Sequence, residues 1–497
     1  MKKVIISILI LFFGFSPLVK GQDAMEILDS TIEAMGGLEK WKDIAQVTMK
    51  YAGHQYWLEQ SENPEGPYLV SYLVSKEVHG VWRQLLFKKD STRHFQVKRP
   101  SVSENVINGN AGLMNFRGRS FPMPYQLKGP LVQWMQLAPE RLILAARNSN
   151  PEQQREEIVD GTPHLVVTFR KNELNRKLFI NKNTRLLTKA EIESHQPNNL
   201  FDNPWGKYTV TIKYNLQWLH KRGIRYPAQW DVYKMGKPWQ SITIFDISFQ
   251  QQIDEALFKI PEGIPEAAEA VSADKTPLKT EGIIEVAPNI FTIPGSWHLG
   301  HVVQADGVVV IEGAISSGYS QQHLGFLRKR YPDKPIKAVM ATSDAWPHIG
   351  GIREFAANGI PIYTHQLNQK IISDLLAADR SLNPDSQATS PKQPNFNLIA
   401  NKLVLSDPET PVEIYSVNGE AGERMIALYF PKQKVLYTSD LIQMTGRKRD
   451  RFFAPQYLSE VKALVDRHDL KVEIVFAMHL SPIPWSRVTE ALKAYQK

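Results

Sequence analysis

The chain has 497 residues, more than one hydrophobic core usually organises, so we expect about two or three domains. Hydrophobic residues make up 42% and charged residues 22%, which excludes a disordered or fibrous chain. The formal net charge is +8, but Lys and Arg alternate with Asp and Glu and form no basic stripe interleaved with aromatic residues. Nucleic acid is therefore not expected as a partner. The absence of cysteine excludes a disulfide framework, a thiolate metal site and a cysteine nucleophile.

The first residues have the pattern of a secretory signal peptide. Lys2 and Lys3 precede an apolar run from Val4 to Phe15, which is too short to span a bilayer. We expect residues 1–22 to be removed and the mature chain to be periplasmic or secreted. No later stretch is long and apolar enough for a transmembrane helix, so we expect none in the mature chain.

Residues 23–262 are expected to form a β-rich domain. Apolar residues from Met25 to Met35 have helical spacing, and Gly36-Gly37 ends that helix. The segment from Leu131 to Arg147 predicts another helix. Alternating apolar and polar residues predict the strands of a large antiparallel sheet. The predicted strands include Gln46–Tyr51, Tyr68–Val74, Trp82–Lys88, Leu165–Phe169, Tyr208–Tyr214 and Ile242–Phe249.

The helix, the antiparallel sheet and a closing Leu257–Pro261 together resemble the bacterial lipoprotein-carrier half-barrels. This resemblance implies an α+β half-barrel-like fold that holds a lipid or acyl chain on its concave face. Seven tryptophans could line such a cavity, although ordinary core packing explains most of them. They are Trp57, Trp82, Trp134, Trp205, Trp218, Trp230 and Trp239.

The composition changes between Pro261 and Gly282 to Pro, Ala, Glu, Ser and Lys, which is typical of a linker. We place the linker at residues 263–281 and a second domain at residues 282–497. Strands and helices alternate in this second domain, as in layered α/β proteins. A hairpin is predicted at residues 302–311, and a buried strand at Ile336–Thr342.

The most informative segment follows that buried strand. Residues Thr342–Gly351 read TSDAWPHIGG and open a helix that Gly359 ends. They resemble the T-H-x-H-x-D-H-x-G-G signature of the metallo-β-lactamase superfamily. The later segments Lys434–Leu441 and Val475–His479 also resemble strands of that family. The resemblance implies an αββα metallo-β-lactamase fold for the second domain.

In this superfamily, zinc lowers the pKa of a bound water so that hydroxide forms near neutral pH. The resemblance places Ser343 and Ala345 where the first metal would have two histidine ligands. Pro347 stands where the second metal would have an aspartate. His348, Asp440 and His479 stand at the remaining ligand positions.

These three residues provide two nitrogen donors and one oxygen donor, which could hold one zinc ion and a water. They could also be hydrogen-bonded residues of a relic pocket. Four other residues are candidates for additions to the site. Asp344 could rotate inward, Glu420 could substitute for a lost histidine, and His298 and His301 could reach the mouth of the pocket.

Three functions remain open. The leading hypothesis is an exported protein of hydrolase ancestry, a pseudoenzyme whose pocket binds a ligand or partner. The first alternative is a mononuclear metal-dependent hydrolase that uses His348, Asp440 and His479. The second alternative is a lipid or acyl-chain carrier that acts through the β-rich domain. The ligand is expected to be a small molecule or a lipid.

Overall fold

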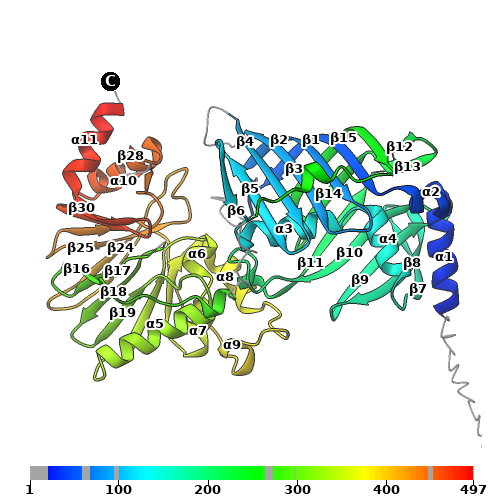
Figure 1. Ribbon diagram of the computed structural model, residues 1–497. Helices are drawn as coiled ribbons and strands as arrows, with labels where there is room; N and C mark the ends of the chain where they lie inside the picture. Colours follow the sequence, from blue (N-terminus) through cyan, green and yellow to red (C-terminus); the bar gives the residue numbers. More distant parts are fainter. Residues whose placement is uncertain are drawn as a thin grey trace, which may run out of the picture.

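The computed structural model describes residues 21–58, 68–93, 100–215, 217–262, 272–295, 297–445 and 451–495. The predicted signal peptide, except for its last two residues, and residues 263–271 of the predicted linker lie outside this part of the chain. Figure 1 shows two regions side by side, which we call the β-rich region (residues 21–262) and the sandwich region (residues 282–495). No helix in the described part is long and apolar enough to cross a membrane.

Among the described residues, thirteen strands of the β-rich region form one antiparallel sheet. They are β1 (Gln46–Tyr56), β2 (Val70–Gly80), β3 (Leu85–Arg93), β4 (Ser101–Asn108), β5 (Ala111–Phe116), β6 (Arg119–Pro122), β7 (Glu152–Val159), β8 (Thr162–Lys171), β9 (Leu174–Asn181), β10 (Leu187–His195), β11 (Lys207–Tyr214), β14 (Gln229–Lys234) and β15 (Lys237–Gln250). Their order is β6-β5-β4-β3-β2-β1-β15-β14-β11-β10-β9-β8-β7. The chain therefore runs outward from β1 to one edge at β6, starts again at the other edge with β7, and runs inward until β15 pairs with β1. A separate hairpin joins β12 (Trp218–Lys221) and β13 (Ile224–Pro227).

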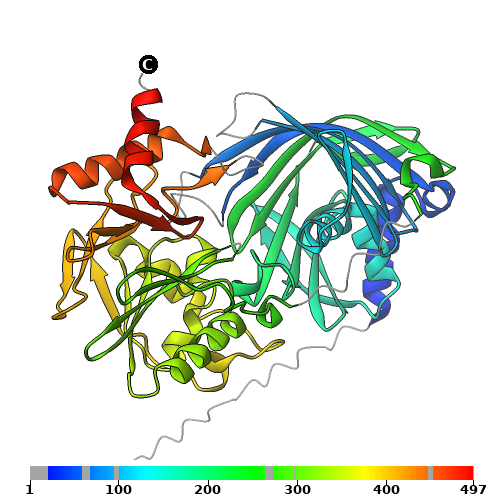
Figure 2. The same ribbon diagram turned by 60° about the vertical axis from the view of Figure 1, so that its left-hand side comes forward.

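The sheet curves around helix α3 (Tyr125–Gln136), which lies on its concave side (Figures 1 and 2). Helix α4 (Pro139–Arg147) follows, and α1 (Gly21–Ala34) and α2 (Leu38–Asp43) cover one end. Trp134, Trp230 and Trp239 are buried, and the ring of Trp134 contacts the other two, with centroids 5.6 Å apart for Trp134 and Trp230. These tryptophans pack in the core, as expected for most of the seven. Kinship with lipoprotein carriers stays a prediction.

The helix predicted at residues 131–147 is two helices in the structure. Pro139 is the reason, because proline lacks a backbone N–H and is favoured in the first turn of a helix. Helix α3 therefore ends at Gln136, and α4 starts at Pro139. The N-terminal helix and the long strands lie where the sequence pattern places them, although the strand predicted from Trp82 begins only at Leu85.

The sandwich region contains two mixed sheets. The first sheet consists of β16 (Ile284–Ala287), β17 (Ile290–Ile293), β18 (Leu299–Gln304), β19 (Gly307–Ile311), β20 (Ile336–Ala341), β21 (Ile362–His365) and β22 (Phe396–Ile399). The second consists of β23 (Lys402–Leu405), β24 (Val412–Ser416), β25 (Ile426–Phe430), β26 (Val435–Tyr437), β29 (Ile474–Ala477) and β30 (Leu480–Pro484). Strands β19 to β22 are parallel, and so are β26 and β29.

These sheets form the middle of a four-layer αββα arrangement. Val309 and Ile311 of β19 face the second sheet and pack against residues such as Leu428, whereas Val308 and Val310 point outward. This alternation follows from the period of a strand. The outward face of the first sheet is covered by α5 (Ser317–Arg330), α6 (Trp346–Ile349), α7 (Ile352–Ala357) and α8 (Gln369–Leu376). The second sheet is covered by α10 (Pro455–Arg467) and α11 (Trp485–Tyr495), and the remaining short elements are α9 (Ser386–Thr389), β27 (Met444–Thr445) and β28 (Arg451–Phe452).

The two regions contact each other through a polar junction. The buried guanidinium of Arg380 donates to the Asn203 carbonyl at 2.7 Å and to Asp274 at 2.8 Å. The ring of Phe201 lies 4.6 Å from that of Trp346, next to the loop that carries the predicted site. Ala273, within the predicted linker, is buried, so this part of the linker is packed. The assignment of two separate domains stays a prediction.

Candidate functional site

The three predicted ligand residues meet at one edge of the sandwich. His348 lies on α6, after the carboxyl end of β20, while Asp440 and His479 follow β26 and β29. The carboxyl ends of adjacent parallel strands lie at the same edge of a sheet, and polar residues there point into the crevice outside the strands. This topology explains why residues far apart in the sequence come together.

A fourth charged residue, Glu312, joins them from the end of β19. Its carboxylate lies 2.9 Å from Nδ1 of His348, and Nε2 of His348 lies 2.8 Å from Asp440. The other oxygen of Asp440 lies 3.1 Å from Nε2 of His479. The result is an ionic chain, Glu312–His348–Asp440–His479, which runs from the interior toward the solvent. The His348 side chain is fully buried, whereas those of Asp440 and His479 are 15% and 26% exposed.

The buried end of the ionic chain is held by hydroxyl groups. Tyr437 donates to Oε1 of Glu312 at 2.6 Å, and the Thr342 hydroxyl donates to the same oxygen. Oγ1 of Thr342 also lies 2.7 Å from the hydroxyl oxygen of Ser439. Since buried carboxylates need hydrogen-bond donors, these contacts fix Glu312 in one position. Glu312 in turn orients the imidazole ring of His348.

The ionic chain shifts the pKa values of its members. Burial would lower the pKa of His348, but the carboxylates of Asp440 and Glu312 outweigh it and raise the pKa to about 10. Burial would raise the pKa of Asp440, but His348 and His479 hold it well below its usual range. Both groups are therefore charged near neutral pH.

The Thr342–Gly351 residues at the predicted ligand positions contribute backbone structure. Ala345 caps α6, and Pro347 lies in its first turn, where proline is favoured. The hydroxyl of Ser343 accepts a hydrogen bond from the Ala345 backbone at 3.2 Å. Asp344 is buried, and its inward rotation into the site stays a prediction. Burial raises its pKa to about 7; nearby Asp440 adds to the rise, while Arg424 and His348 oppose it.

Two of the residues weighed as additions do not reach the site. Glu420 is exposed, and the backbone of its loop is bound instead by Glu460, which accepts from Ala421 and Gly422 at 2.9 Å each. His301 stacks on Phe291 beneath α5, on the outer face of the first sheet. These two expectations were wrong because sequence order does not reveal on which face of a strand or loop a side chain lies.

His298, in contrast, lies beside the strand pair that carries His479. Its backbone N–H donates to the carbonyl of Met478 at 2.7 Å, and its ring lies 3.3 Å from the Ser481 hydroxyl. Its Nδ1 accepts from the Gly295 backbone at 2.9 Å. The ring is thus committed to local hydrogen bonds that position the loop around His479.

The donor chemistry of the site fits zinc, but its spacing does not. In a tetrahedral zinc site, the bonds to nitrogen and oxygen are about 2.0–2.2 Å long, so two donor atoms lie about 3.3–3.5 Å apart. The contacts of Asp440 with His348 and His479 are ion pairs of 2.8 and 3.1 Å, which are shorter than this separation. Within the described residues, no group of three or more His, Cys, Asp or Glu side chains is arranged to hold a metal ion. As arranged, the candidate ligands bind one another.

This arrangement has a definite chemical capacity. The interior end is a fixed pair of opposite charges, and the outer end presents the imidazole of His479 backed by the Asp440 carboxylate. A half-buried imidazole with a carboxylate partner can bind an anionic or hydrogen-bonding group, or exchange a proton with it. The ionic chain can therefore recognise a ligand without a further bound group.

No family model matches the chain. It is similar to the 2,4-dinitroanisole O-demethylase subunit alpha of Nocardioides sp. strain JS1661, with 26% identity over 136 residues, or 27% of this chain and 38% of that protein. Among solved structures it is similar to the sec-alkylsulfatase Pisa1 from Pseudomonas sp., with 17% identity and a TM-score of 0.33 over 43% of this chain and 40% of that one. It is also similar to a metallo-β-lactamase from Pontibacter korlensis, with 17% identity and a TM-score of 0.34 over 43% and 98% of the two chains. The chain thus spans less than two thirds of the demethylase subunit and of the alkylsulfatase.

Proposed function

We propose that the sandwich region descends from metallo-β-lactamase-type hydrolases, has lost two-metal hydrolysis and acts as a ligand- or partner-binding module of an exported protein. The observation that carries this proposal is the ionic chain, in which both ring nitrogens of His348 contact carboxylates. The αββα layering and the Thr342–Gly351 loop support the ancestry.

The argument for lost hydrolysis rests on the donor atoms. A two-metal site needs ligands on both sides of the attacking water. Ser343 and Ala345 provide no imidazole at the first metal position, and Pro347 provides no carboxylate at the second. At the second position, a metal would have to break the contacts of Asp440 with His348 and His479 before it could bind. Breaking such buried contacts costs free energy that a site with so few ligands must recover.

A second candidate function is favoured by one specific contact. Metal-binding histidines usually donate their other ring N–H to a carboxylate or carbonyl, which fixes the ring. Glu312 stands in this relation to Nδ1 of His348. This contact is what a mononuclear metal-dependent hydrolase would need, with His348, Asp440 and His479 as its ligands.

Metal analysis of the mature protein, purified in zinc-containing buffer, separates the two functions. We expect the wild type to contain far less than stoichiometric zinc, and His348→Ala to contain no less than the wild type. The exposed His220 provides a matched control, since His220→Ala removes an imidazole far from the site. Stoichiometric zinc that His348→Ala loses and His220→Ala keeps would overturn the proposal in favour of the mononuclear hydrolase.

Activity assays provide the second test. We expect no hydrolysis of a β-lactam, a thioester or a phosphodiester above the rate without protein. The panel should include 2,4-dinitroanisole, because the similarity to the demethylase subunit makes ether cleavage a substrate class to test. Zinc-dependent turnover that His348→Ala abolishes would show that the site is catalytic.

A further inference from the structure

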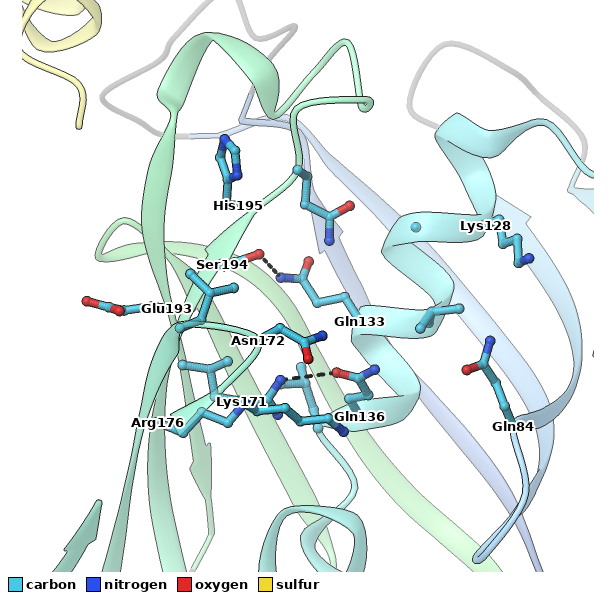
Figure 3. A pocket seen from close by; sticks show the side chains of 16 residues that line it. Gln84, Lys128, Gln133, Gln136, Lys171, Asn172, Arg176, Glu193, Ser194 and His195 are labelled. Atoms are coloured by element: carbon cyan, nitrogen blue, oxygen red, sulfur yellow. Dashed lines mark hydrogen bonds between the residues drawn. The ribbon is translucent and has the colours of Figure 1, made fainter. Parts of the chain in front are cut away.

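The β-rich region contains a polar pocket of about 330 Å³ between α3 and the ends of β8, β9 and β10. Figure 3 shows Gln133 and Gln136 extending from α3 toward the strands, opposite Arg176 and Ser194. The volume lies at the lower end of the range for small-molecule sites. The pocket is separate from the ionic chain of the sandwich region, so an inference about it goes beyond the proposed function.

The pocket contains a buried cation that no carboxylate neutralises. Arg176 is only 7% exposed, and among the described residues no carboxylate pairs with it. Its guanidinium donates to Oε1 of Gln136 at 3.3 Å and lies 6.0 Å from the Phe169 ring, while its Nε has no partner. Burial of an unpaired charge costs free energy, and buried arginines are normally paired. A contribution to stability therefore does not explain why the charge of Arg176 is buried without a carboxylate partner.

Further positive charge surrounds the same pocket. Lys171 and Lys128 both line it, and Lys128 donates to the Asn110 carbonyl near the rim. Partial desolvation, together with the neighbouring cations Arg176 and Arg141, lowers the pKa of Lys171, which indicates a positive local potential. The one carboxylate of the lining, Glu193, accepts from the Asn175 backbone and points away from the cavity (Figure 3). The pocket thus presents a net positive surface to a ligand.

The rest of the lining can bind hydroxyl groups. Side-chain amides come from Gln84, Gln133, Gln136, Asn172 and Gln196, and Ser194 provides a hydroxyl. Gln133 is 8% exposed; it donates to Ser194 at 2.7 Å, while its Oε1 is buried with no partner. Amides both donate and accept hydrogen bonds, as a ligand with several hydroxyl groups requires. An acyl chain would leave these groups unpaired, so the lining disfavours a lipid.

We propose that this pocket binds a small, hydroxyl-rich molecule that carries an oxyanion, with a uronic acid or a sugar phosphate as the chemical type. The oxyanion lies against Arg176 and Lys171, and the hydroxyl groups lie along the amides of α3. The oxyanion forms a bidentate pair with the guanidinium of Arg176 and supplies the negative charge that no described carboxylate provides there.

Isothermal titration calorimetry of the mature protein tests this inference with D-glucuronate, glucose 6-phosphate, glucose and inorganic phosphate. We expect both sugar acids to bind at least about tenfold more tightly than glucose, because only they carry the oxyanion. Glucose 6-phosphate should also bind more tightly than inorganic phosphate, because it adds the hydroxyl groups. Affinities that do not differ between glucuronate and glucose, or between the two phosphates, would overturn the ligand class.

Variants identify the site. Arg176→Gln should weaken glucuronate binding by about tenfold or more, and exposed Lys171→Gln should weaken it less. The matched control is Arg155→Gln, which removes one exposed positive charge from β7 outside the pocket and should leave the affinity unchanged. Because Lys171 is exposed, Lys171→Gln keeps the test valid if Arg176→Gln fails to fold. Equal affinities in the wild type and in Lys171→Gln, or no binding of either acid at about 10 mM, would overturn the proposal.

Discussion

Each region of the molecule buries a histidine between two carboxylates. In the β-rich region, His79 lies 2.7 Å from Glu140 and 3.4 Å from Glu77. In the sandwich region, His348 lies 2.9 Å from Glu312 and 2.8 Å from Asp440. Both imidazoles are fully buried, and in both cases the carboxylates raise the pKa against the opposing effect of burial.

The two histidine–carboxylate clusters differ in whether they reach the solvent. Glu77 and Glu140 are as buried as His79, and Glu77 also accepts from Tyr51 at 3.0 Å and from Trp134 at 2.9 Å. That cluster is closed within the core. The ionic chain at His348 continues instead through Asp440 to a half-buried histidine. A buried histidine between carboxylates therefore does not by itself indicate a functional site, and the cluster that reaches the solvent is the better candidate.

The largest expected effect is on stability. His79→Ala leaves Glu140 buried without its ion-pair partner and Glu77 with only the neutral donors of Tyr51 and Trp134, so it should destabilise the protein by about 3–5 kcal/mol. His348→Ala should cost less, about 2–3 kcal/mol, because Asp440 keeps His479 and Glu312 keeps the Tyr437 and Thr342 hydroxyl groups. Urea unfolding measures the change in the free energy of unfolding for each variant, and hydrogen exchange shows in which region the stability is lost. A larger loss for His348→Ala would break the comparison between closed and open clusters.

The site was predictable from the sequence only where a motif or a strand end marks it. Asp440 and His479 follow β26 and β29, which pair in parallel, and the packing of the two sheets brings the Thr342–Gly351 loop after β20 beside them. Glu312 was missed because one acidic residue after a buried strand carries no spacing signal. A rule that examines every charged residue directly after an apolar strand would have found it.

The His79 cluster shows a different limit of sequence reasoning. His79 has no partner at helical spacing, and Glu140 lies 61 positions away on α4, so the contact depends on how the helix docks on the sheet. The sheet itself was predictable because alternation is a local pattern. Its thirteen-stranded order was not, since strand pairing such as that of β1 with β15 joins distant segments.

The next effect concerns metal affinity at the open cluster. The triple variant Ser343→His, Ala345→His and Pro347→Asp restores three donors beside His348, Asp440 and His479. We expect its zinc affinity to exceed that of the wild type by about a hundredfold or more, because each donor joins a partly organised pocket. Competition with a chromophoric chelator measures this gain. The same affinity in both proteins would mean that the ionic chain resists opening.

A smaller effect is expected from pH. The pKa of His348 is raised from 6.5 to about 10, so its ionic stabilisation is complete below pH 6.5 and is lost as pH rises through about 10. The lowered pKa of Asp440 acts on the other side, since its contribution is present above pH 3.8 and is lost as pH falls. The difference in unfolding free energy between the wild type and His348→Gln should therefore be larger at pH 6 than at pH 10. A difference that grows with pH would show that His348 is neutral in the fold.

The smallest effect concerns the contact between the regions. Phe201 of the β-rich region packs on Trp346, two residues before His348, whereas no described aromatic pair links the His79 cluster to the sandwich region. Phe201→Ala removes an aromatic pair worth about 0.5–1.5 kcal/mol beyond its buried area. We expect faster hydrogen exchange in residues 342–351 and unchanged exchange in β2, which carries His79. The exposed Phe245 provides the control, since Phe245→Ala should alter neither segment. If Phe201→Ala loosened β2 as much as the signature loop, the two clusters would share one cooperative unit, and their different roles could not be assigned to separate regions.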